Sequence, residues 1–135
     1  MPSSIFELTS DLAVLEVTAV KRPLKAATDA ATTLTAEECV GGIVTMTPTA
    51  ARALTTPTGA ELKTLLGGPL EIGTSFQLNV VNVAAATHAI TLTAAASGIT
   101  LGGVAGMATV AAASSASYVF VCTAVGTPAF TVFRG

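Results

Sequence analysis

Apolar and polar residues alternate from residue 73 to residue 93, and this pattern predicts two β-strands. Side chains along a strand point to opposite faces in turn, so apolar residues two apart mark a half-buried strand. The apolar positions of the two predicted strands are Phe76, Leu78, Val80, Ile90 and Leu92. The link of small residues at 84–87 is short enough to turn the chain back. We therefore predict an antiparallel hairpin at the centre of the chain.

Shorter alternating segments, separated by glycine and proline turns, predict further strands. They lie at 40–46, 51–55, 99–101, 108–111, 117–123 and 129–133. Apolar residues occupy both faces of the segment at 117–123, which indicates a central strand or an edge strand covered by a partner. Many short strands with regular turns predict an all-β fold, an antiparallel β-sandwich or jelly-roll-like barrel.

One short helix interrupts this pattern at 57–66. Thr58 precedes Glu61 by three residues, which is the spacing of a capping box, and Leu62, Leu65 and Leu66 form its expected apolar face. Residues 35–38 are expected to form a turn or a single helical turn, for which Thr35 is a candidate N-cap.

The N-terminal part of the chain differs from the rest, and we predict an extended arm at 1–33 followed by the β-sandwich domain at 34–135. Small and polar residues at 25–33 have the composition of a linker. Apolar residues with little core of their own favour docking on this domain or on a neighbouring subunit. The interface residues expected in the arm are Leu8, Leu12, Val14, Leu15 and Val17.

The charge distribution is unusual. Charged residues make up 10% of the chain, against about 25% in typical soluble domains. Between Glu71 and Arg134 there is no Asp, Glu, Lys or Arg, although exposed sheet edges are normally protected by charges. Either neighbouring subunits cover these edges, or Thr, Ser and Gly keep them hydrated; the pattern favours burial in an assembly.

Composition also argues against two classes of partner. The formal net charge of −2, without a cluster of Lys and Arg, argues against nucleic acid. The uncharged stretch at 104–125 is long enough for a membrane span, but Ser, Thr and Gly interrupt it, and it is better explained as two strands and a turn. The N-terminus lacks the basic and apolar regions of a signal peptide.

Reactive residues do not form a recognisable constellation. His88 is the single histidine, and Cys39 and Cys122 lack metal-ligand spacing, so we expect two buried free thiols. The adjacent residues Glu37 and Glu38 point apart and suit a helix start better than paired acid–base catalysis. We therefore expect no enzyme activity, cofactor or metal. The rival interpretation, a small hydrolase, requires His88 beside a carboxylate or hydroxyl in a cleft.

A family resemblance adds to this interpretation. The run that begins LTAEECVGGIVTM and ends FQLNVVN, followed by THAITLTAAASGITLGG, SASYVFVCT and AFTVF, resembles the β-domain of small bacteriophage capsid-decoration (cement) and head-fibre proteins. The resemblance covers residues 34–135. It implies a trimeric β-sandwich or jelly-roll-like domain, made in the host cytoplasm, that binds the major capsid protein on the outer virion surface. A tail-fibre or spike component, or a host-recognition module, is the alternative.

Overall fold

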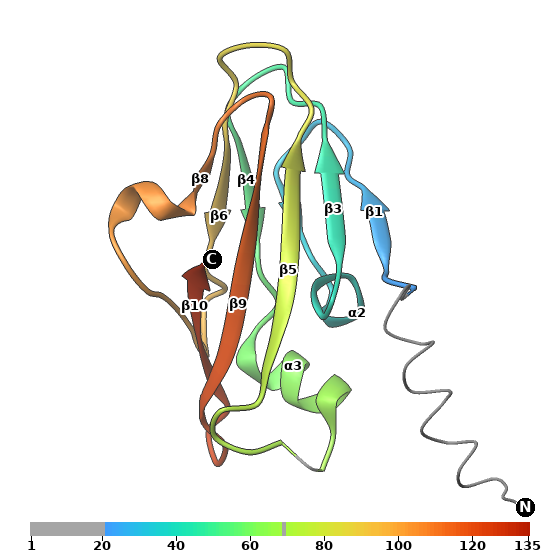
Figure 1. Cartoon of the computed structure of the whole chain (residues 1–135). Coiled ribbons are helices and arrows are strands. Elements are labelled where there is room, and N and C mark those ends of the chain that lie inside the picture. The colour runs from blue at the N-terminus through green and yellow to red at the C-terminus, as the bar shows by residue number, and fades with distance from the viewer. Residues whose placement is uncertain (1–20, 69) are drawn as a thin grey trace, which may run out of the picture.

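The computed structural model describes residues 21–68 and 70–135, and they form two β-sheets packed face to face (Figure 1). The six-stranded sheet has the order β1-β3-β5-β9-β10-β7, and the four-stranded sheet has the order β2-β4-β6-β8. In the first sheet the strands are β1 (Leu24–Ala26), β3 (Ile43–Met46), β5 (Ser75–Asn82), β9 (Ser114–Ala124), β10 (Ala129–Arg134) and β7 (Ile99–Leu101). In the second they are β2 (Thr32–Thr33), β4 (Arg52–Thr55), β6 (Ile90–Thr93) and β8 (Thr109–Val110).

The chain alternates between the two sheets from β1 to β6. Consequently β1, β3 and β5 are parallel neighbours in one sheet, and β2, β4 and β6 are parallel neighbours in the other. Parallel neighbours require a crossover connection, and here a strand of the opposite sheet forms each crossover. Antiparallel pairing is confined to β5–β9, β9–β10 and β6–β8, while β7 runs parallel to β10.

The predicted fold class is therefore wrong. The described residues contain two α-helices and two mixed sheets, so the fold is mixed α/β and is not an all-β antiparallel sandwich or jelly-roll-like barrel. The predicted central hairpin is also wrong, because its two strands belong to different sheets. β5 pairs with β3 and β9, whereas β6 pairs with β4 and β8 in the other sheet. The apolar faces of β5 and β6 pack toward one another across the core instead of lying side by side.

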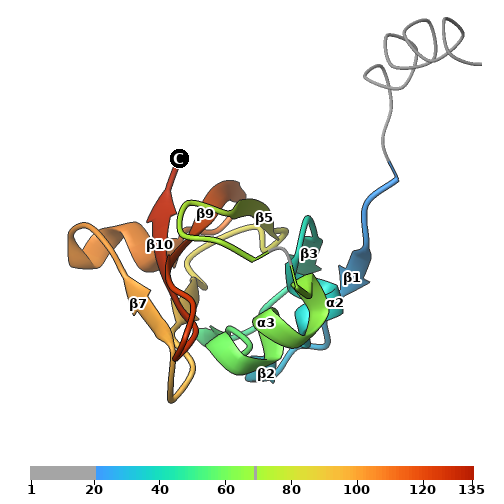
Figure 2. The ribbon, with the colours of Figure 1, turned by 90° about the horizontal axis from the view of Figure 1, so that it is seen from below.

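Two helices lie together at one end of the sheets (Figure 2). Helix α3 (Gly59–Leu66) confirms the predicted capping box, because the Thr58 hydroxyl accepts from the Glu61 amide and the Glu61 carboxylate accepts from the Thr58 amide. Helix α2 (Ala36–Cys39) has the same arrangement with Thr35 as N-cap. The predicted apolar face of α3 is partly wrong: Leu62 is fully buried, but Leu65 is 40% exposed.

The core lies between the sheets and is built from the inward positions of their strands. The Phe76 and Phe120 rings stack with centroids 4.7 Å apart, and Phe130 packs against Phe76 at 6.1 Å. Strand β9 lies between β5 and β10. The prediction of a central strand at 117–123 is therefore confirmed, with Phe120 and Cys122 on its inward face and Val119 and Val121 on its outward face.

The segment interpreted as a linker, 25–33, contributes to both sheets. It contains most of β1 and all of β2, and its Asp29 joins the loop between them to β4. The Asp29 carboxylate accepts hydrogen bonds from the Thr49 amide at 3.1 Å, from the Thr49 hydroxyl, and from Arg52 Nε at 2.8 Å. The bond from Arg52, followed by those from Thr49, holds the pKa of Asp29 well below its usual value.

This lowered pKa gives a first prediction, on pH dependence. An Asp whose pKa is lower in the folded state stabilises the fold above its unfolded pKa, about 3.9, and the contribution is lost as pH falls below that value. We expect Asp29→Asn to lower the free energy of unfolding at neutral pH, with the difference from wild type vanishing in acid. Urea titrations from neutral to acidic pH measure this. Glu71→Gln, at an exposed carboxylate, is the control; an equal effect of both substitutions contradicts the prediction.

Candidate interaction surface

Titratable side chains do not gather into a site within the described ranges. No group of three or more His, Cys, Asp and Glu side chains is placed to hold a metal ion there. His88 is half-buried in the connection between β5 and β6, where its backbone carbonyl accepts a hydrogen bond from the Asn82 side chain at 2.8 Å. Among the helices of residues 21–68 and 70–135, none combines the length and the apolar character that crossing a membrane requires.

The two cysteines are free and buried, as predicted. Cys39 ends α2, and Cys122 lies on the inward side of β9. Burial raises the pKa of the Cys39 thiol to about 12, so it stays protonated at neutral pH and is a poor nucleophile.

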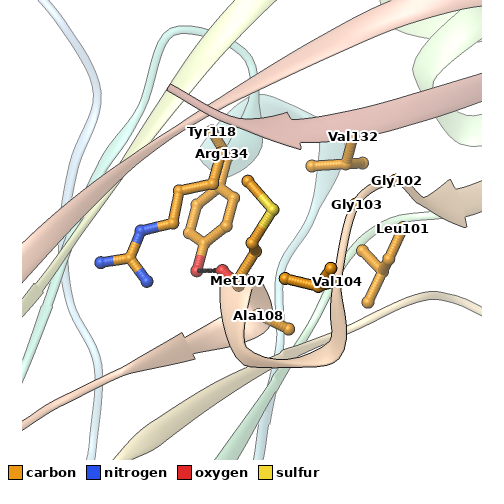
Figure 3. Close-up of a pocket in the computed structure, with 9 residues that line it drawn as sticks. All are labelled: Leu101, Gly102, Gly103, Val104, Met107, Ala108, Tyr118, Val132 and Arg134. Carbon is orange, nitrogen blue, oxygen red and sulfur yellow. Dashed lines mark hydrogen bonds between the residues drawn. The ribbon is translucent and has the colours of Figure 1, made fainter.

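A small cavity of about 100 Å³ lies beneath the 3-10 helix η1 (Ala105–Ala108), as Figure 3 shows. The Tyr118 hydroxyl donates to the carbonyl of Met107 at 3.1 Å, and Arg134 Nη1 donates to the carbonyl of Thr109 at 2.8 Å. Burial raises the pKa of Tyr118, and the positive charge of Arg134 opposes this. These two bonds hold the connection around η1 against β9 and β10. We therefore assign Tyr118 and Arg134 a structural role.

Within residues 21–68 and 70–135, no element covers the outer face of the six-stranded sheet. Register places its outward side chains in rows across the strands, such as Gln77, Val119 and Phe133 on β5, β9 and β10. We name this surface the uncharged face. Its residues are Leu24, Ala26, Ile43, Thr45, Ser75, Gln77, Asn79, Val81, Thr100, Ser115, Ser117, Val119, Val121, Thr131 and Phe133.

The uncharged face deserves its name because no Asp, Glu, Lys or Arg stands among these described strand positions. Two of its apolar side chains are exposed, Leu24 at 71% and Phe133 at 46%, and Val119 and Val121 between them are partly buried. In Figure 1 the outer sides of β3, β5 and β9 turn toward the viewer, and no described element crosses them. A sheet face with accessible Val, Ile, Leu and Phe and no charge is a candidate contact surface for another protein.

Two cations lie at the rim of this surface, because Lys21 and Arg22 line a shallow depression beside Gln77, and Arg22 is held in place by hydrogen bonds. The Arg22 guanidinium donates to the carbonyls of Gly41 and Gly42 at 2.7 and 3.1 Å, and to Asn79 Oδ1 at 2.6 Å. Asn79 in turn donates to the Ser117 hydroxyl. These bonds anchor the segment before β1, but all three acceptors are uncharged, so Arg22 keeps its positive charge at the β1–β3 rim of the face.

The outer face of the four-stranded sheet differs in character. Register aligns Thr33, Thr55 and Thr93 in one row, and Ala53, Thr91 and Thr109 in the next. Hydroxyl groups cover this face, so water can hydrate it without a partner. The contrast makes the six-stranded sheet the stronger candidate for a contact surface.

The interface residues predicted from sequence, Leu8, Leu12, Val14, Leu15 and Val17, lie outside the described residues, and so does most of the predicted arm. Sequence reasoning identified the uncharged C-terminal half but missed the face that it forms. The alternation in β5, β9 and β10 indicates which residues of each strand point outward. Only the pairing register shows that these residues lie side by side on one surface. Comparisons with protein-family models, with curated proteins and with solved structures gave no match.

Proposed function

We propose that this protein is a structural subunit, without catalytic activity, that decorates the outer surface of a bacteriophage capsid as a homo-oligomer, expected to be a trimer, bound to the major capsid protein. The observation that carries the proposal is the uncharged face, which lies largely within the part of the chain that lacks charges between Glu71 and Arg134. A subunit stabilised by neighbours needs a large contact area and no reactive group. The order of segments that resembles decoration proteins supports the viral assignment.

The direct test is co-sedimentation of the purified chain with undecorated phage heads, assembled from the major capsid protein of the same genome. The proposal expects saturable binding in whole-number ratio to the capsid subunits and an increase in the temperature at which the heads disrupt. A protein that stays in the supernatant at every salt concentration overturns the proposal, and binding to tails or to host-cell glycans would favour the recognition module instead.

Deletion of residues 1–20 gives a second prediction. If the apolar residues of the arm contact the shell or a neighbouring subunit, the shortened chain keeps Arg22 and β1, folds with an unchanged unfolding midpoint, and no longer sediments with heads. Circular dichroism checks the fold, and co-sedimentation checks the binding. A second variant keeps the chain length and replaces five apolar residues together by Ser: Leu8, Leu12, Val14, Leu15 and Val17. It should also fail to sediment with heads. Full attachment by the shortened chain contradicts the prediction.

A further inference from the structure

We propose that the uncharged face is the surface through which one copy of this chain binds another. The proposal rests on the homo-oligomer in the proposed function and assigns the self-contact to particular residues. Because a surface that binds the same surface of another copy relates the two copies by a two-fold axis, it predicts a dimer in place of the expected trimer. Three properties suit the face to this contact: its area, its lack of charge, and the charges elsewhere on the described surface.

The area of the face is suitable for a protein contact. Neighbouring strands lie about 4.8 Å apart, and outward residues of one strand about 6.7 Å apart, which gives the face roughly 500 Å² of flat area. Side-chain relief and the rim add to this value. A standard interface buries about 800 Å² on each partner, whereas most crystal-packing contacts bury less than about 400 Å². The face therefore offers an area between these values before its rim is counted.

The missing charges favour a second copy over a charged partner. Over β9 and β10, away from the rim at Arg22, a partner with a charged surface would lose hydration of its charges and find no opposite charge in return. Other parts of the described surface carry such charges, including exposed Glu37 on α2 and exposed Glu61 on α3. The uncharged face itself presents Val, Ile and Phe among Ser and Thr hydroxyls. The same face on another copy matches it best, because apolar groups meet apolar groups and hydroxyls can pair with hydroxyls.

The centre of the face is Val119, which lies between Gln77 on β5 and Phe133 on β10. Around it, Val121 continues the apolar surface along β9, and Phe133 packs close to Gly102, where an added Cβ would lie 2.7 Å from the Phe133 ring. One edge of the Phe133 ring therefore packs against Gly102, which limits the side-chain conformations open to it before a partner binds. Large side chains held in place lose little conformational entropy on binding, which suits an anchor at the centre of an interface.

The test compares Val119→Lys with Thr91→Lys. Both substitutions add one cation at an outward strand position, but Thr91 lies on the four-stranded sheet. We expect wild type and T91K to form the same oligomer by light scattering, and V119K to have the single-chain mass of 13.3 kDa with an unchanged circular dichroism spectrum. A single-chain wild type, or an oligomeric V119K, overturns the proposal.

A second measurement keeps the test decisive if V119K fails to fold. Val119→Cys and Thr91→Cys each add an accessible thiol to a chain whose native cysteines are buried. A water-soluble maleimide should label V119C several-fold more slowly in the oligomer than after dilution to single chains, whereas the labelling rate of T91C should not change with concentration. A V119C rate that is the same at all concentrations overturns the proposal, and protection that appears only with heads assigns the face to the capsid and overturns it too. An oligomer held by this face that ignores heads contradicts only the viral function.

Discussion

Gly59→Ala should lower the free energy of unfolding by about 3 kcal/mol, because this substitution overfills a well-packed site. A Cβ built at Gly59 would lie 2.2 Å from the carbonyl oxygen of Pro128 and 3.1 Å from the Cα of Gly98. Both obstacles are backbone atoms, so no side-chain rotation relieves the clash. The Gly59 amide also donates to the carbonyl of Ser97 at 3.2 Å. The start of α3, the β6–β7 turn and the β9–β10 turn therefore meet at this residue.

The sign of this effect distinguishes packing from helix propensity. Alanine is favoured over glycine by up to about 1 kcal/mol inside a helix, so a fold without this close approach would gain stability from G59A. Because Gly59 lies so close to Pro128 and Gly98, G59A should instead lower the melting temperature by about 10 °C for a domain of this size. Gly126→Ala is the matched control, since a Cβ there meets nothing within 4 Å, and it should change stability by less than about 0.5 kcal/mol. A G59A protein as stable as G126A would contradict the convergence of the three segments.

Local features of the fold could be predicted from the sequence because their causes are local. Helix α3 follows from the Thr58–Glu61 capping box, whose two partners lie three residues apart, and β4 follows from a short alternating segment that ends before Pro57. In both cases the interaction that defines the element lies within one turn or one strand. The predicted bounds therefore agree with the structure to within two residues.

Strand pairing could not be predicted, because alternation shows that one face of a strand is buried but does not show its neighbour. The segments around Leu78 and Leu92 each bury one apolar face, and an antiparallel hairpin or two opposed sheets would satisfy both equally well. The structure has the second arrangement, in which β5 and β6 face one another across the core. The approach of Gly59 to Gly98 is likewise a contact between distant segments, and the glycines themselves carry no signal of it.

The candidate face illustrates the same limit. The absence of charge between Glu71 and Arg134 is a property of the sequence, and it correctly directs attention to the C-terminal half. It does not show where the uncharged residues lie. Only the register of β5, β9 and β10 places Gln77, Val119 and Phe133 in one row, and only the pairing of β1 and β3 with β5 extends that row into a broad surface.

The second large effect is expected at Asn82, a polar side chain that is 1% exposed. Its Nδ2 donates to the carbonyls of His88 at 2.8 Å and Val110 at 3.0 Å, and its Oδ1 accepts from the amide of Ala84 at 3.0 Å. One amide group therefore satisfies three backbone groups and joins the β5–β6 connection to β8. Buried polar groups that lose their partners cost about 1–3 kcal/mol each. Loss of the Asn82 amide would therefore leave the carbonyls of His88 and Val110 and the amide of Ala84 without this partner.

Asn82→Asp keeps the shape of the side chain and its acceptor but removes both donors and sets a carboxylate against two carbonyl oxygens. We expect it to lower the free energy of unfolding at neutral pH by about 4 kcal/mol, because two buried acceptors lose their partners and a charge is buried. Burial and the carbonyl dipoles should raise the pKa of the new carboxyl in the folded state. The folded state then binds the proton more tightly, so the deficit should grow as pH rises above the unfolded value of about 3.9 and shrink in acid.

Asn79→Asp is the matched control, because it makes the same substitution three residues earlier on β5, on the outward side. There the new carboxylate replaces the amide oxygen that accepts from Arg22, and a charge-assisted bond offsets the lost bond to Ser117. N79D should therefore differ from wild type by less than about 1 kcal/mol, since a partly exposed ion pair contributes little. Urea unfolding of both variants from neutral to acidic pH measures the difference. If N82D and N79D match at every pH, the Asn82 amide does not hold the β5–β6 connection to β8.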